Sequence, residues 1–294
     1  MKRSLITLNV LFLSTWTFDF ALAAKSDTDE TATAAKSARI HRIENGLLPG
    51  ILIKGRPLHE MRLIDKMEHY KVPGVSIAFF SQGKILWTRA YGYADVSRKN
   101  AVTAETLFQA ASISKSISAL AALRLVQSGK VDLDEDVNVK LKGWIVPDNE
   151  FTKEQKVTLR RILSHSAGLT VPGFPGYAAG DHLPTIVQIL DGQSPANTSA
   201  VKVDVVPGTI WRYSGGGYTV MQLLLTNVTN DSFPDILDRE VLRPLGMSHS
   251  TFAQPLPTAL RREAATGPER RHAHRGRCSY LSRTGGSWTL DHAN

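Results

Sequence analysis

The hydrophobic and polar positions near the start of the chain predict a helix followed by a β-hairpin. Residues 58–70 carry apolar side chains at roughly helical spacing, and Pro73-Gly74 ends that element. Residues 75–80 and 85–93 are rich in β-branched and aromatic side chains, and a turn that contains glycine joins them. The chain is therefore expected to open in the order helix, strand, strand.

Between about residues 105 and 245 the pattern changes to helical spacing, and no internal repeat is visible. The expected helices cover residues 113–127, 158–164, 184–191, 218–227 and 233–242. Glycine or proline follows several of these segments, as is usual where helices end. We therefore expect a large helical region after the hairpin.

The first 24 residues have the pattern of a signal peptide. Lys2 and Arg3 form a charged start, an apolar run continues towards residue 24, and Ala21-Leu22-Ala23 offers a small-x-small cleavage site. Asp19 interrupts the run, which makes a stable membrane anchor the weaker alternative. Either interpretation predicts export of the body of the protein, to the periplasm or the medium. No other stretch is long and apolar enough to span a bilayer.

The remainder divides by composition into a flexible lead-in at 25–54, one domain at 55–260 and an atypical basic tail at 261–294. The lead-in opens with a polar, low-complexity segment. The tail uses arginine as its only basic residue besides histidine and has almost no aliphatic side chains. It is interpreted either as a disordered basic tail or as the result of a lost reading frame near Gly267.

Charge and cysteine content exclude two classes of protein. The net charge of +8 lies mainly at the ends, because residues 261–294 hold seven arginines against three acidic residues. This distribution argues against a nucleic-acid partner, which would need a basic surface on the folded body. Cys278 is the single cysteine, so no disulfide forms within the chain and stability must come from packing.

The strongest chemical candidate is the segment Ser112-Ile113-Ser114-Lys115 at the start of a predicted helix. A serine hydroxyl is a weak nucleophile until a base takes its proton. Residues three apart lie on one face of a helix, so the Lys115 amine can reach the Ser112 hydroxyl. Burial can lower the pKa of a lysine until it acts as a base near neutral pH.

The same Ser-x-x-Lys spacing occurs a second time, at Ser81 and Lys84. That copy lies in the predicted hairpin turn, where no helix face would align the two side chains. We therefore place the nucleophile at Ser112.

A further candidate is Tyr213, in the segment from Trp211 to Tyr218 that contains three consecutive glycines. A tyrosine can act as a general acid or base when positive charge lowers its pKa. The glycines would let the backbone approach a ligand closely, or would simply form a turn before a helix. A phosphate-binding P-loop does not fit, because the Lys-Ser/Thr ending is missing.

Taken together, the order Ser112-x-x-Lys115, then Leu163-Ser164-His165-Ser166-Ala167-Gly168-Leu169, then Tyr213-Ser214-Gly215 resembles the serine β-lactamase, D,D-peptidase and esterase family. The resemblance covers roughly residues 55–255 and is closest to the class C-like branch. It implies an α+β fold of the β-lactamase/transpeptidase type, with an antiparallel sheet and a large helical region. It also implies that Ser112 is the nucleophile, Lys115 its activating partner and Tyr213 the proton shuttle, whereas His165 belongs to an element that we interpret as structural.

The sequence departs from the family pattern in two places. Gly215 stands where the family has asparagine in Tyr-x-Asn, which weakens the case for β-lactam or peptide substrates and leaves ester hydrolysis more open. The family also has a Lys/His-Thr-Gly strand well over a hundred residues beyond the tyrosine, and 81 residues follow Tyr213 here. We interpret Arg283-Thr284-Gly285-Gly286 as a coincidental match, so the late strands of the sheet are expected to be missing.

The resemblance predicts a serine hydrolase that forms an acyl-enzyme on a small β-lactam, ester or D-Ala-peptide substrate and needs no cofactor. The alternative is a truncated product, or a relative that binds penicillin or cell wall without turnover. An α/β-hydrolase is excluded because Arg212 stands where the Gly-x-Ser-x-Gly elbow around Ser214 needs glycine. A metal site at His272, His274 and Cys278 is discounted because that segment lacks periodic structure.

Overall fold

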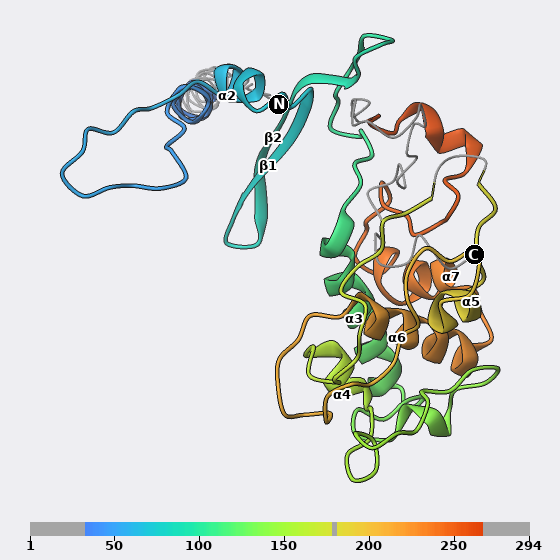
Figure 1. Cartoon of the computed structure of the whole chain (residues 1–294). Helices are drawn as coiled ribbons and strands as arrows, with labels where there is room; N and C mark the ends of the chain where they lie inside the picture. Colours follow the sequence, from blue (N-terminus) through green and yellow to red (C-terminus); the bar gives the residue numbers. More distant parts are fainter. Residues whose placement is uncertain (1–32, 178–180, 267–294) are drawn as a thin grey trace, which may run out of the picture. The chain divides into compact units, whose positions relative to one another are not determined.

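A computed structural model describes residues 33–177 and 181–266 of the chain. The chain divides into two compact units, Met1–Val72 and Pro73–Asn294. Figure 1 shows the elements of both units, coloured along the sequence. Each unit is described by itself below.

In the smaller unit, residues 33–45 are helical, and α2 follows at Leu63–His69. Helix α2 lies within the span 58–70 predicted for it. The segment predicted as a lead-in over 25–54 thus contains a helix at residues 33–45. That segment is rich in alanine, lysine and arginine, and the helix propensity of these residues outweighs its low apolar content.

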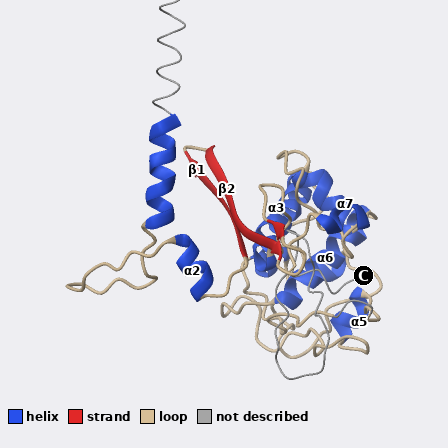
Figure 2. Ribbon diagram, turned by 90° about the horizontal axis from the view of Figure 1, so that it is seen from above, coloured by secondary structure: helices blue, strands red, loops and turns tan. Residues whose placement is uncertain are grey.

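The larger unit opens with the predicted hairpin, formed by β1 (Gly74–Ser81) and β2 (Lys84–Asp95). The two strands pair in antiparallel register from Gly74 opposite Gly92 to Ser81 opposite Lys84. They lie side by side as a two-stranded ribbon in Figure 2. A third, short strand β3 (Asn100–Ala101) pairs with the end of β2 and was not predicted.

Helices and short helical turns make up most of the rest of this unit. They are α3 (Ser114–Gln127), α4 (Leu159–Leu163), α5 (Ile186–Asp191), α6 (Gly215–Thr229) and α7 (Phe233–Leu237), with short 3₁₀ turns at Ala111–Ile113, Val137–Val139 and Thr258–Arg262. The helix predicted over 233–242 is α7 followed by a π-helical turn at Asp238–Leu242.

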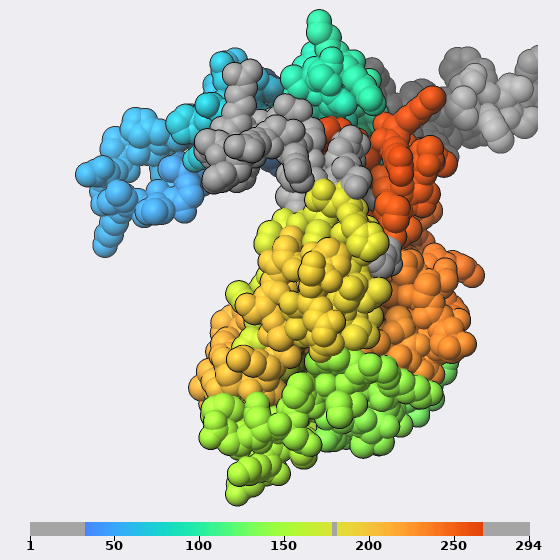
Figure 3. Space-filling model, turned by 45° about the vertical axis from the view of Figure 1, so that its right-hand side comes forward, coloured from blue at the N-terminus to red at the C-terminus, as the bar shows by residue number. Residues whose placement is uncertain are grey.

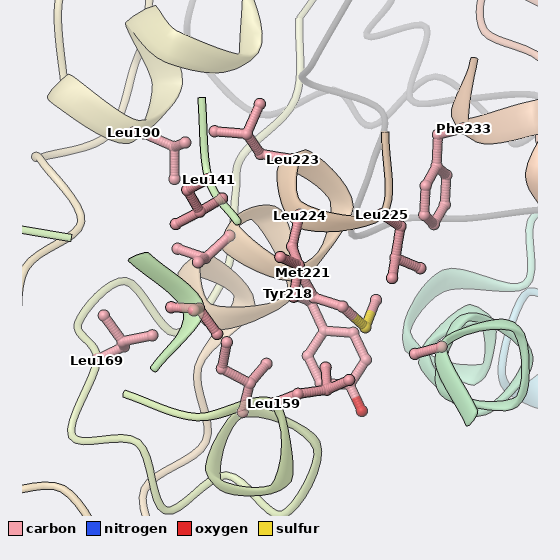
Figure 4. Packing of buried hydrophobic residues seen from close by; sticks show 14 of the residues in the cluster. Leu141, Leu159, Leu169, Leu190, Tyr218, Met221, Leu223, Leu224, Leu225 and Phe233 are labelled. Atoms are coloured by element: carbon pink, nitrogen blue, oxygen red, sulfur yellow. The ribbon is translucent and has the colours of Figure 1, made fainter. Parts of the chain in front are cut away.

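Helix α6 forms the centre of the hydrophobic core. Every residue from Gly215 to Leu225 is buried, and α3, α4, α5 and α7 all pack against this helix. Apolar side chains leave α6 on different sides, with Leu223 on the side of Leu190 and Leu225 on the side of Phe233 (Figure 4). A helix that is apolar all round must be enclosed by other elements.

The three glycines before Tyr218 lie inside α6, whereas the sequence predicted a turn or a ligand-binding loop ahead of a helix at 218. The Gly215 and Gly216 N–H groups donate to the carbonyl oxygens of Pro172 and Val171, at 3.2 and 2.9 Å. The Gly217 N–H donates to the Ser214 side chain at 2.9 Å. All three donors are therefore used by the protein itself and are not available to a ligand.

Side-chain hydrogen bonds hold the long segment before α4 against α5 and its neighbours. The Trp144 indole N–H donates to Asp191 at 2.8 Å, and the Asn149 amide donates to the Val203 carbonyl oxygen at 2.7 Å. In the space-filling view the green segment before α4 and the yellow segment that carries α5 lie side by side (Figure 3). These bonds replace the regular backbone ladder that the segment lacks.

The first residues of the predicted basic tail are ordered with the body. The Leu107 N–H donates to the Glu263 carbonyl oxygen at 2.9 Å, and the Ala265 N–H donates to the Leu107 carbonyl oxygen at 2.8 Å. Leu107, Leu256 and Ala264 form a small buried cluster beside this pairing. The apolar contacts of the body therefore continue past the predicted boundary at 261, to Ala264.

The described residues form no strand after Ala101, and the late strands implied by the family resemblance are not among them. Leu120 and Leu123 on α3 stay exposed, with 39% and 43% of their surface accessible. No helix in the described parts of the chain is long and apolar enough to cross a membrane. Antiparallel strands together with packed helices place the unit in the α+β class, as predicted.

A substitution at Gly216 tests the close packing of α6. A Cβ atom there would lie 2.7 Å from the Thr170 carbonyl oxygen and 2.8 Å from a Val201 methyl carbon. We expect Gly216→Ala to lower the free energy of unfolding by about 1–3 kcal/mol, as overpacking does. Gly173→Ala is the matched control, since a Cβ there meets nothing within 4 Å. Urea denaturation measures both variants.

The direction of the change in unfolding free energy separates packing from helix propensity. If propensity alone acted, Gly216→Ala would stabilise the helix by about 1 kcal/mol. A Gly216→Ala variant as stable as the parent would contradict the packing described here.

Candidate active site

The candidate site begins where the chain enters α3. Ser112 lies in the 3₁₀ turn Ala111–Ile113, and Lys115 lies in the first turn of the helix that follows. The Lys115 Nζ and Ser112 Oγ atoms are 3.3 Å apart. The Ser112 side chain is exposed, whereas Lys115 is only 7% accessible. The arrangement presents a hydroxyl to solvent and keeps the amine behind it.

The backbone immediately before Ser112 adopts an uncommon conformation. Ala111 has a φ of +48°, in the left-handed region that non-glycine residues seldom occupy. Such a conformation costs on the order of 1–3 kcal/mol and persists only where the surrounding structure imposes it. Here it turns the chain sharply into α3, so that Ser112 lies at the tip of the turn.

Two aromatic rings surround the Lys115 ammonium. Its Nζ atom lies 4.8 Å from the centre of the Tyr213 ring and 5.5 Å from the centre of the Tyr218 ring. Burial lowers the pKa of Lys115, and a hydrogen bond with Tyr213 and the charge of that phenolate act in the opposite direction. The net pKa is lowered, which increases the fraction of free amine at a given pH.

Tyr213 lies within hydrogen-bond distance of Ser112, although 101 residues separate them in the sequence. The Tyr213 hydroxyl donates to Ser112 Oγ at 2.8 Å. Burial acts to raise the pKa of Tyr213, but hydrogen bonds with Lys115 and Ser112 and the positive charge of Lys115 outweigh it. The pKa of Tyr213 is therefore below its ordinary value. The structure thus brings together all three site residues named from the sequence.

His165 also belongs to this cluster, although the sequence suggested only a structural role. Its ring centre lies 4.4 Å from that of Tyr213 and 5.4 Å from that of Tyr218. Its Nδ1 atom accepts the Ser214 N–H at 3.2 Å. Burial, and then the charge of Lys115, lower the pKa of His165. The signal that could have identified it is an imidazole in the short segment between the predicted helix at 158–164 and Gly168.

The second Ser-x-x-Lys copy has a different setting. Ser81 and Lys84 face each other across the two-residue turn of the hairpin, and both are exposed. Among the described residues the cation–π contacts are those of Lys115, and Lys84 makes none. This copy therefore lacks the buried amine and the neighbouring phenol that characterise the first.

Two of the features discounted in the sequence cannot be placed. The segment Arg283–Gly286 and the residues His272, His274 and Cys278 lie outside the described residues. Within the described parts, no group of three or more histidine, cysteine, aspartate or glutamate side chains is arranged to hold a metal ion.

The sequence profile of the Beta-lactamase family matches residues 62–282. The match covers most of the chain and includes Ser112, Lys115 and Tyr213. The chain therefore belongs to the β-lactamase family of proteins, in which serine β-lactamases and penicillin-binding proteins share one fold.

Two curated relatives show how far the similarity extends. Protein flp of Staphylococcus aureus (strain N315) is 27% identical over 192 residues, which are 62% of this chain and 35% of that protein. Penicillin-binding protein 4 of Amycolatopsis lactamdurans is 30% identical over 185 residues, which are 63% of this chain and 46% of that protein. The chain thus spans less than half the length of these relatives.

Solved structures give the same fold. EstCE1, described as a hydrolase with promiscuous acyltransferase activity, is 25% identical with a TM-score of 0.52 and matches 62% of this chain and 49% of its own. A penicillin-binding protein from Bacillus halodurans is 20% identical with a TM-score of 0.51 and matches 71% and 61%. The family membership, the penicillin-binding relative and EstCE1 support a serine hydrolase-like function.

Replacement of Lys115 tests its electrostatic effect on Tyr213. In Lys115→Met the positive charge and the hydrogen bond are lost while burial remains, so the pKa of Tyr213 should rise. NMR of ¹³C-labelled tyrosine, with the Tyr213 signal assigned by Tyr213→Phe, measures this change. Lys84→Met removes the lysine of the second copy and should leave the Tyr213 titration unchanged. An unaltered Tyr213 pKa in Lys115→Met would show that the two groups are not coupled.

Proposed function

We propose that this protein is a serine hydrolase that acts through an acyl-enzyme on Ser112. The observation that carries the proposal is the convergence on Ser112 Oγ of the Lys115 amine at 3.3 Å and the Tyr213 hydroxyl at 2.8 Å. A serine with two groups able to accept its proton has what nucleophilic catalysis requires.

In the first step Ser112 Oγ attacks the carbonyl carbon of the substrate, and its proton passes to the Lys115–Tyr213 pair. Burial lowers the pKa of Lys115, and the charge of Lys115 lowers the pKa of Tyr213. The two groups together therefore lose a proton more readily than a separate lysine and tyrosine would, and the pair can then accept the proton of Ser112. The positive end of α3, which begins two residues after Ser112, stabilises the negative charge that develops on the carbonyl oxygen.

In the second half of acylation Tyr213 delivers the proton to the leaving group, and the bond from the carbonyl carbon to that group breaks. A water molecule then attacks the ester on Ser112, with the same pair accepting its proton. Release of the acid returns the proton to Ser112 Oγ. Ser112, Lys115 and Tyr213 suffice for these reaction steps, which require no cofactor.

For the substrate, we propose a small acyl compound, with an ester favoured over a β-lactam or a D-Ala-terminated peptide. Gly215 carries no side chain that could bind a substrate amide. A Cβ atom at this position would lie 3.1 Å from the Pro172 carbonyl oxygen, so the backbone of that segment occupies the adjacent space. The signal-peptide pattern at 1–24 further leads us to propose that the protein acts outside the cytoplasm.

The assignment of the nucleophile is tested by two matched serine variants. We expect Ser112→Ala to lower kcat/KM for p-nitrophenyl butyrate by about 10³-fold or more, as loss of a nucleophile does. Ser81→Ala, in the exposed hairpin copy, should retain activity close to that of the parent. Steady-state hydrolysis and labelling with a fluorophosphonate probe check both variants. Equal loss in the two variants would overturn the assignment of Ser112.

A second candidate function is acylation without turnover, as in a penicillin-binding relative. It is supported by the similarity to penicillin-binding protein 4 of Amycolatopsis lactamdurans, which is 30% identical over 185 residues.

A fluorescent penicillin separates the two candidates. A hydrolase that turns over β-lactams should be labelled at Ser112 and lose the label within minutes to hours, whereas a binder should keep the label and should not hydrolyse p-nitrophenyl butyrate either. Denaturing gel electrophoresis of samples chased with unlabelled penicillin measures this release, and Ser112→Ala gives the background. A folded protein that accepts neither this probe nor the fluorophosphonate would contradict both candidates.

A further inference from the structure

Both chain neighbours of Tyr213 are hydrogen-bonded to one residue, His165. The Arg212 N–H donates to the His165 carbonyl oxygen at 2.7 Å. The Ser214 N–H donates to His165 Nδ1 at 3.2 Å. Tyr213 therefore lies between two hydrogen bonds that fix the backbone on either side of it.

The imidazole ring also restricts the Tyr213 side chain. The two ring centres lie 4.4 Å apart, and the rings are tilted by 37°. Trp211 contacts the imidazole edge-on from another side, with the two ring centres 6.1 Å apart. With its backbone and its ring both held, Tyr213 can keep its hydroxyl 2.8 Å from Ser112 Oγ.

His165 reaches these positions because of its own backbone conformation. It follows α4, and its φ of +56° lies in the left-handed region that non-glycine residues seldom adopt. The His165 N–H donates to the Ile162 carbonyl oxygen at 3.1 Å, and the Ser166 N–H donates to the Arg161 carbonyl oxygen at 2.8 Å. These bonds hold the turn in which the carbonyl oxygen and the ring of His165 both bind the segment around Tyr213.

We propose that His165 is a positioning residue for Tyr213 and that it works as a neutral imidazole with its proton on Nε2. The inference rests on the proposed role of Tyr213 in proton transfer. Because the Ser214 N–H is a donor, Nδ1 must accept and must carry no proton. Protonation of Nδ1 would set two N–H groups against each other and release the chain at Ser214.

The surroundings of His165 favour this neutral form. Lys115 faces it from α3, Tyr213 from the segment before α6, and Tyr218 from α6. On the two loops that His165 joins, Arg212 donates to the Gly168 carbonyl oxygen and pairs with Asp204.

The direction of the pH dependence follows from these groups. Burial, followed by the charge of Lys115, holds the pKa of His165 below its ordinary value of 6.5. The neutral ring is therefore retained as the pH falls through 6.5 and is lost only at lower pH. We expect an acid limb of kcat below the usual imidazole range.

Replacement of His165 by asparagine or by glutamine tests whether the residue acts by accepting the Ser214 N–H or only by filling space. In His165→Asn the side-chain oxygen takes the place of Nδ1 as an acceptor, cannot titrate, and tolerates a positive φ. In His165→Gln the amide reaches instead towards the place of Nε2. With p-nitrophenyl butyrate we expect kcat to fall about 10- to 100-fold in His165→Gln, with KM changed less than threefold. His165→Asn keeps the acceptor but loses the ring, so kcat should fall less than in His165→Gln, and the acid limb assigned to His165 should be lost.

A measurement that needs no turnover separates failure of this inference from failure of the proposed function. NMR of ¹⁵N-histidine-labelled protein, with the His165 signals assigned by difference from His165→Asn, reports the tautomer directly. We expect an unprotonated Nδ1 in the neutral ring. The Tyr213 ring signals should be displaced less in His165→Asn, which keeps the acceptor for the Ser214 N–H, than in His165→Gln.

A neutral His165 with its proton on Nδ1 would overturn the inference, whether or not the protein hydrolyses the ester. Equal kcat values and equal acid limbs in the parent and His165→Gln would also overturn it. If the parent shows no hydrolysis but the NMR results are as expected, the proposed function fails while the positioning role of His165 stands.

Discussion

The first turn of α6 packs closely on the backbone of the segment from Thr170 to Gly173. Gly215 and Gly216 make this approach possible, and their N–H groups bond to the carbonyl oxygens of Pro172 and Val171. The contact determines where α6 begins and therefore where Tyr213, two residues before it, must lie. The remainder of α6 packs against four other helices. A shift of this first turn would therefore require those helices to repack.

Burial of Lys115 destabilises its charged form and so increases the fraction of free amine beside Ser112. An ammonium removed from water is unfavourable unless other groups replace its hydration. The Tyr213 and Tyr218 rings and the hydrogen bonds with Ser112 and Tyr213 provide part of this replacement. Desolvation nevertheless outweighs them, because the net pKa of Lys115 is lowered. The lowered pKa means that more of Lys115 is present as the free amine, which can accept the proton of the neighbouring hydroxyl.

The sequence was sufficient to predict the hairpin and α3, because each has a clear period and a glycine that ends it. It was misleading at Gly215–Gly217, where propensity favours a turn but packing against Thr170 and Val201 demands a helix without side chains. It also missed β3, whose two residues carry no period, and the helical segment at 33–45, which lacks an apolar stripe. Burial and long-range pairing decide these elements, and neither is visible in a local window.

The candidate site illustrates the same limit at the level of chemistry. Two segments share the Ser-x-x-Lys spacing, and the spacing alone cannot distinguish them. At Ser81 the serine and lysine lie opposite each other across a tight turn, in water and on a strand edge. At Ser112 the lysine lies inside the protein, and Tyr213, 101 residues later, completes the cluster. The difference therefore arises from the tertiary fold. Tyr213, a residue distant in sequence, places its hydroxyl beside Ser112 and its ring against the Lys115 ammonium.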